Sequence, residues 1–172
     1  MNEAGVLEEI FNFRWRGPNL ATGGQPLESE LRAVAAAGFG VVINLALLDA
    51  EYSLADEPGL VRELGMTFFH IPVIWECPMQ ENLQQFFILM RQVEGRKVFL
   101  HCAANMRVSV FLALYRMRHL DWTYTNAMAE VTDIWEPDPR LASLYSASDQ
   151  HQRLTIRFST RLSPQCAGAP RV

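Results

Sequence analysis

Blocks of apolar residues alternate with amphipathic segments along most of the chain. Three short runs are apolar at nearly every position: Gly40–Leu47 (GVVINLAL), Met66–Val73 (MTFFHIPV) and Lys97–Cys102 (KVFLHC). Continuous runs of this length are typical of strands that are buried on both faces. The segments between them have apolar residues three or four positions apart, which is typical of helices that bury one side.

The helical pattern is strongest where stop signals accompany it. The predicted helices cover residues 27–37, 57–64, 80–93, 107–120 and 124–135, and residues 138–158 are also expected to be helical. In the first, Leu27, Leu31, Val34 and Ala35 fall on one face, and Gly38 follows as a stop. We expect Asp56 and Thr123 to cap the second and the last of the five. Residues 107–120 are apolar on nearly every side, which predicts a buried helix.

Buried strands that are separated by helices predict one α/β domain with three layers, a mainly parallel central sheet between helices. We place this domain at residues 1–160 and expect residues 161–172, which are small, polar and proline-bearing, to be a disordered tail. Ligand sites of parallel sheets form beyond the carboxyl ends of the strands. Cys102 lies at such an end.

Composition narrows the possible functions. The 172 residues suit a single domain, and a net charge of −4 gives no reason to expect binding to nucleic acid or to a membrane surface. The chain has no signal-peptide pattern and no run near the roughly 20 apolar residues of a membrane span. Its three cysteines, Cys77, Cys102 and Cys166, are widely spaced, which favours a cytoplasmic protein without a disulfide framework. The histidines show no metal-ligand spacing, so we expect no metal and no other cofactor.

The stretch VFLHCAANMRVSV, Val98 to Val110, places a thiol between a buried strand and a helix. The amides of a tight loop that enters a helix can bind an oxyanion, and their positive potential favours a thiolate over a thiol. Arg107 can add a bidentate contact to the anion, and Ser109 can donate a hydrogen bond to the sulfur when it leaves. The arrangement therefore predicts a nucleophilic cysteine site.

The segment HCAANMRVS resembles the signature loop of the cysteine-dependent protein tyrosine phosphatases, which reads H-C-x5-R-S/T. The segments ATGGQPLESELRAVAAAGFGVVINL, FFHIPVIWECP and DIWEP resemble a bacterial group of small tyrosine-phosphatase-like proteins, related to domains fused to NAD kinases or to β-lactamase-like hydrolases. The resemblance implies the phosphatase-like fold, a phosphorylated substrate and a phosphocysteine intermediate. It also implies that the oxyanion is surrounded by loop residues: His101, Ala103, Ala104, Asn105, Met106 and Val108.

The loop departs from the superfamily pattern in two ways. Arg107 follows Cys102 by five positions instead of six, and Val108 occupies the sixth, although Ser109 keeps its usual separation. The loop also lacks glycine, so we predict that Asn105 adopts the left-handed or a strained conformation.

Phosphoester hydrolysis needs an acid for the leaving oxygen, and in the superfamily this is usually an aspartate before the preceding helix. The corresponding loop, IWECPMQEN, has no aspartate, so Glu76 is the first candidate. Glu136 in IWEPDP is the second, and Asp133 is weaker because we expect it on a helix face. Cys77 is a possible redox partner of Cys102.

Other interpretations stay open. Cys102 and His101 can be ordinary core residues, Ser109 can bond to a carbonyl one turn back, and Gln25 can simply belong to a turn. The chain can bind an oxyanion without turnover. The short C-x4-R spacing also resembles rhodanese-like sulfurtransferases. The sequence leaves the substrate and the oligomeric state undetermined.

Overall fold

A computed structural model describes residues 3–137 of the chain. The predicted helix at 138–158, the tail at 161–172 and Cys166 lie outside the described residues.

The sheet has five short strands in the order β1-β2-β5-β3-β4. The strands are β1 (Arg14–Gly17), β2 (Leu20–Gly23), β3 (Val41–Asn44), β4 (Thr67–His70) and β5 (Val98–His101). All neighbouring pairs are parallel except β1 and β2, which form an antiparallel edge. The predicted fold class, an α/β domain with a mainly parallel sheet, is confirmed.

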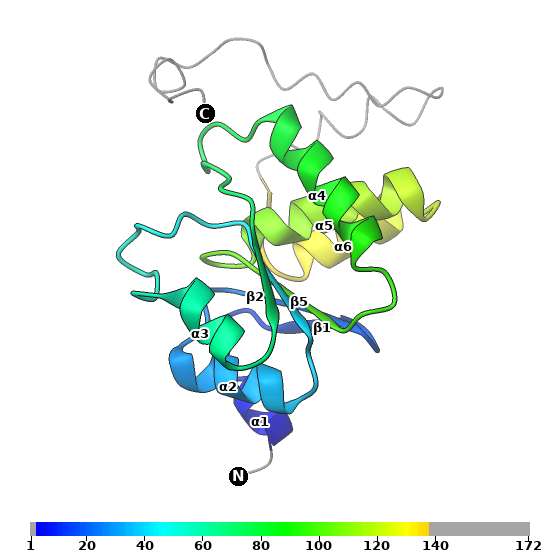
Figure 1. Cartoon of the computed structure of the whole chain (residues 1–172). Coiled ribbons are helices and arrows are strands. Elements are labelled where there is room, and N and C mark those ends of the chain that lie inside the picture. The colour runs from blue at the N-terminus through cyan, green and yellow to red at the C-terminus, as the bar shows by residue number, and fades with distance from the viewer. Residues whose placement is uncertain (1–2, 138–172) are drawn as a thin grey trace.

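Helices cover both faces of this sheet. They are α1 (Glu3–Leu7), α2 (Glu28–Ala36), α3 (Glu57–Glu63), α4 (Gln80–Gln92), α5 (Met106–His119) and α6 (Tyr124–Thr132). Figure 1 shows α1, α2 and α3 on one side of the sheet and α4, α5 and α6 on the other. Each face has its own apolar cluster, so the domain has the three layers that the pattern predicts.

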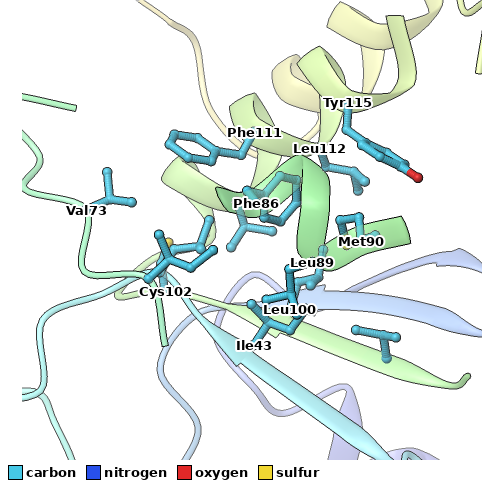
Figure 2. Close-up of a cluster of buried hydrophobic side chains, with 14 of the residues drawn as sticks. Ile43, Val73, Phe86, Leu89, Met90, Leu100, Cys102, Phe111, Leu112 and Tyr115 are labelled. Atoms are coloured by element: carbon cyan, nitrogen blue, oxygen red, sulfur yellow. The ribbon is translucent and has the colours of Figure 1, made fainter. Parts of the chain in front are cut away.

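Alternation along β5 decides which side chains face which layer. Val98 and Leu100 pack in the cluster under α4 and α5, whereas Phe99 packs in the cluster on the α1–α3 side. Cys102 continues the first of these series and is 1% exposed. Figure 2 shows it at the edge of this cluster, beyond Leu100. The thiol therefore belongs to the α4–α5 side of the sheet.

The predicted caps are present. The Asp56 side chain accepts a hydrogen bond from the Gly59 amide at the start of α3, and Thr123 accepts one from Asn126 at the start of α6. Gly38 follows α2 with a φ of 85°, which agrees with its predicted role as a stop. Helix α5 is buried along most of its length, as its composition predicts.

Strands β1 and β2 were not predicted from the sequence, and two expectations were wrong in detail. Leu27 precedes α2 and is 62% exposed, so it does not share the buried face of Leu31 and Val34. Helix α6 ends at Thr132 instead of Trp135, because Asp133 turns towards arginines of β1. None of the helices within residues 3–137 is long and apolar enough to cross a membrane.

Candidate active site

The candidate site lies at the carboxyl end of β5, between β2 and β3. The last residue of this strand, His101, pairs with Gly23 of β2 and with Asn44 of β3. Cys102 comes next, and α5 begins at Met106. A crevice at the carboxyl ends of parallel strands is the usual position of a ligand site in such a sheet.

Asn105 is the residue at which the chain turns into α5. It has φ 64° and ψ 0°, so the left-handed conformation predicted for it is confirmed. Its Nδ2 donates to the Asn12 carbonyl at 2.8 Å and to Thr22 Oγ1 at 2.9 Å. The amides of Met106, Arg107 and Val108 belong to the first turn of the helix, where amides have no partner within the helix. These amides are the donors that an oxyanion needs.

The TGG segment at the end of β2 supports the loop from behind. A Cβ on Gly24 would lie 2.9 Å from the Ala103 carbonyl oxygen and 3.0 Å from the Phe11 carbonyl oxygen, so only glycine fits there. The amide of Gln25 donates to the Ala103 carbonyl at 3.0 Å. Asn12 Nδ2 donates to the Ala104 carbonyl at 3.1 Å. Two carbonyls of the loop are thus fixed to earlier parts of the chain.

Arg107 crosses the ends of the two neighbouring strands. Its Nη1 donates to the Val73 carbonyl at 2.9 Å and to the Leu45 carbonyl at 3.2 Å, and its Nη2 lies 3.4 Å from the Tyr52 hydroxyl. A guanidinium group has five N–H donors, so these contacts leave Nε and part of Nη2 for another acceptor. The short spacing from Cys102 therefore places the arginine beside the loops that follow β3 and β4.

Ser109 makes the contact of an ordinary helix serine. Its hydroxyl donates to the Met106 carbonyl at 2.8 Å, and its oxygen accepts the indole N–H of Trp135 at 3.2 Å. In this structure the hydroxyl proton therefore goes to Met106 and not to the Cys102 sulfur. Cys102 has a free thiol and forms no disulfide with Cys77. Val108 is fully buried in the core, so only its amide can face an anion.

Two tryptophans bring the candidate acids to the same region. The rings of Trp75 and Trp135 lie 5.7 Å apart, and Trp135 is fixed to α5 through Ser109. Glu76 and Glu136 follow these tryptophans directly in the chain, and both side chains are exposed. Asp133 is instead bound in ion pairs to Arg14 and Arg16.

A buried carboxylate that was not predicted from the sequence lies close to the start of the loop. Glu57 lies at the start of α3, and its Oε1 is 2.6 Å from His101 Nε2. Its Oε2 accepts from Gln25 Nε2 at 3.0 Å and from Asn44 Nδ2 at 3.1 Å. Burial alone raises the pKa of Glu57, but His101 and the hydrogen bonds from Gln25 and Asn44 outweigh it and hold the pKa below its usual 4.5. Gln25 is therefore part of this network and not only of a turn.

Comparison with known proteins yields structural matches only. No family model and no curated protein matches the chain. A DUF442 protein of Shewanella putrefaciens CN-32, described as a candidate phosphatase, is 31% identical with a TM-score of 0.71, and the match covers 83% of this chain and 94% of that one. A second crystal structure described in the same way is 30% identical with a TM-score of 0.72 and coverage of 89% and 99%.

More distant structures share the fold. Tk-PTP in its active form is 21% identical, with a TM-score of 0.65 and coverage of 81% of this chain and 98% of that one. TpbA of P. aeruginosa in complex with pTyr is 16% identical, with a TM-score of 0.55 and coverage of 70% and 72%.

Proposed function

Because the chain belongs to the DUF442 family of cysteine-dependent, tyrosine-phosphatase-like proteins, we propose that it hydrolyses phosphomonoesters with Cys102 as the nucleophile. One observation carries the proposal: the cysteine directly follows the central strand, left-handed Asn105 turns the chain, and the first turn of α5 follows at once. This order of elements directs helix amides and a thiol to the same place.

In the proposed complex the phosphate oxygens accept hydrogen bonds from the first-turn amides of α5. Arg107 contributes Nε and Nη2, while its Nη1 stays bound to the carbonyls of Leu45 and Val73. Two N–H groups on one side of a guanidinium match two phosphate oxygens, so the arginine can bind them in bidentate fashion. Because the amides and the arginine supply positive potential, the scheme needs no metal ion.

The reaction has two steps. In the first, the Cys102 thiolate attacks phosphorus, an S–P bond forms and the P–O bond to the leaving alcohol breaks. An acid gives the leaving oxygen its proton. In the second, water attacks phosphorus, the S–P bond breaks, and the same carboxylate accepts a proton from the water. The products are the alcohol and inorganic phosphate, and the thiolate is regenerated.

Glu76 is the proposed acid, and Glu136 is the alternative. The contact between Trp75 and Trp135 supports both, because each carboxylate follows one of these rings in the chain. We expect Glu76→Gln to reduce turnover of alkyl phosphates about 10²-fold or more, since these leaving groups need a proton. Turnover of p-nitrophenyl phosphate should fall much less. If Glu136→Gln shows this difference and Glu76→Gln does not, the assignment is reversed.

The proposal is tested by turnover of aryl phosphates by the full chain over a range of pH. The wild type should release phosphate, and Cys102→Ser should abolish release while its circular dichroism spectrum is unchanged. Arg91→Gln on α4 is a suitable control, since this arginine lies away from the carboxyl edge of the sheet. Equal inactivity of wild type and Cys102→Ser with all leaving groups would refute the hydrolase.

A binding protein without turnover is the second candidate, and the burial of the thiol favours it. Cys102 is 1% exposed within an apolar cluster, and Ser109 does not stabilise the sulfur. Calorimetric titration with vanadate or phosphate distinguishes the two functions: binding that Arg107→Met abolishes, without any turnover, would select the binding role. A thiosulfate-to-cyanide assay of the same protein should give no product, and product formation would select the sulfurtransferase.

A further inference from the structure

Glu57 connects the three strands that surround the cysteine. It is fully buried, and its two carboxylate oxygens contact side chains at the ends of β5 and β3 and just after β2. These three strands are neighbours in the sheet, with β5 in the middle. One carboxylate from α3 therefore joins the whole carboxyl edge at the position where Cys102 begins the loop.

Several contacts hold the ring and the backbone of the histidine in this network. The ring of His101 stacks on Phe99 with centroids 5.6 Å apart, and its carbonyl accepts the Leu45 amide at 2.9 Å. The next amide, that of Cys102, lies 3.4 Å from the Gly23 carbonyl. Because these contacts hold both sides of the peptide between His101 and Cys102, the direction of the cysteine side chain depends on them.

Glu57 is also the charged side chain that contacts the ring of His101. Nε2 of His101 donates to the carboxylate, while Nδ1 is buried and has no partner within the described residues. Nearby ionisable groups are engaged elsewhere, since Asp56 caps the Gly59 amide and His70 contacts the Ala46 carbonyl. Among residues 3–137, Glu57 is thus the carboxylate that holds the ring of His101 next to Cys102.

We propose that Glu57 is a positioning residue of the cysteine site, which acts through His101 to orient Cys102 and to favour its thiolate. The inference rests on the proposed function, in which Cys102 is the nucleophile. The Glu57–His101 contact fixes the last residue of β5, and the peptide that carries Cys102 follows it directly. In this role it keeps the sulfur beside the first-turn amides of α5, whose positive potential favours a thiolate. Loss of the carboxylate leaves the buried ring N–H without its acceptor, so the peptide of Cys102 is held less firmly and the thiolate loses part of this support.

The test measures alkylation of Cys102 by iodoacetamide against pH, followed by mass spectrometry of the peptide that contains Cys102. The full chain is compared with Glu57→Gln, Glu57→Asp and a matched control, Glu63→Gln, which removes an exposed acid from the same helix. We expect the alkylation midpoint of Glu57→Gln to rise by about one pH unit. Glu57→Asp should recover part of this shift, and Glu63→Gln should match the wild type.

Kinetics supply a second measurement. Glu57→Gln should lower kcat for aryl phosphates about 10-fold or more and change KM by less than about 3-fold, because it alters the nucleophile and not the groups that bind phosphate. His101→Gln should give a similar loss, and the double variant should lose little more, since both residues act through one contact.

The possible failures differ from one another. A folded Glu57→Gln variant with the wild-type alkylation curve and wild-type kcat overturns the positioning role, even if Cys102→Ser abolishes turnover. An inactive wild type whose alkylation curve still shifts in Glu57→Gln refutes the hydrolase and supports the effect on the thiol. If Glu57→Gln does not fold, the imidazole NMR spectrum of the wild type provides the test. We expect a proton on Nε2 of His101, which the contact with Glu57 requires. An unprotonated Nε2 would overturn the inference.

Discussion

At the scale of single residues, the loop depends on Asn105. A non-glycine residue with φ near +60° costs free energy, and asparagine tolerates this conformation better than most. Its Nδ2 offsets that cost with two hydrogen bonds, a partly buried one to Asn12 and a buried one to Thr22. Glycine would satisfy the backbone but would lose both bonds.

Substitution of Asn105 should therefore follow a definite order. Asn105→Ala combines backbone strain with the loss of both hydrogen bonds and is expected to lower the free energy of unfolding by about 2–4 kcal/mol. Asn105→Gly keeps the conformation accessible and should cost about 1 kcal/mol less than alanine. Urea denaturation with a common m-value measures the difference. Equal stability of the two variants would show that the left-handed conformation does not matter.

Arg107 supports the structure and, in our proposal, binds the substrate. Lysine cannot hold the Leu45 and Val73 carbonyls and also present two N–H groups to an anion. We expect Arg107→Lys to reduce kcat/KM for aryl phosphates at least about 10-fold, since a bidentate charged contact is lost. Steady-state kinetics provide the measurement, with Arg91→Lys on α4 as the control. An unchanged kcat/KM would exclude Arg107 from anion binding.

At the scale of elements, the segment after α6 closes over the start of α5. Arg14 and Arg16 of β1 hold Asp133, and the Trp135 indole donates to Ser109. Trp135→Phe keeps most of the ring contact with Trp75 but removes the N–H donor, so we expect a loss of about 0.5–1.5 kcal/mol in urea denaturation. Trp135→Ala should cost more, because the ring is lost as well. If Trp135→Phe were as unstable as Trp135→Ala, the ring contact would contribute nothing beyond the hydrogen bond, which would contradict this prediction.

The elements that the sequence predicts well are those whose pattern is set locally. The buried strands β3 and β5 are continuous apolar runs, and α4 has a clear apolar stripe, so length and periodicity suffice. Strands β1 and β2 are four residues each and contain Arg14, Arg16 and Gly23, which are not typical of strands. Strand β1 pairs with β2, and β2 in turn pairs with β5, which follows about 75 residues later; no local pattern carries that second pairing.

The same limit applies to the site. Cys102, the loop and the conformation of Asn105 follow from one contiguous segment, and the sequence predicts their placement. Glu57 follows a capping aspartate at a helix start, where an exposed acid is the usual expectation. Only the packing of α3 against the end of β5 shows that it is buried and paired with His101.

At the scale of the whole molecule, Glu57 makes stability depend on pH. Its pKa is lower in the folded protein than its usual 4.5, so its contribution is complete above that value and is lost as the pH falls through the folded pKa. We expect the stability advantage of the wild type over Glu57→Gln to be constant between pH 6 and 7 and to shrink below about pH 4.5. Urea denaturation of both proteins between pH 3 and 7 measures this. An advantage that grows in acid would contradict the sign.

The strand order β1-β2-β5-β3-β4 has a consequence for synthesis on the ribosome. Strands β2 and β3 emerge early but do not touch each other in the sheet, since β5 lies between them. Until residues 98–101 leave the exit tunnel, both strands present unpaired edges to other chains. The nascent domain cannot fold in two separate halves, because both halves of its sheet need β5. Its folding is therefore delayed until β5 inserts between β2 and β3. Chaperone binding to stalled chains should therefore fall sharply once the cysteine loop has emerged.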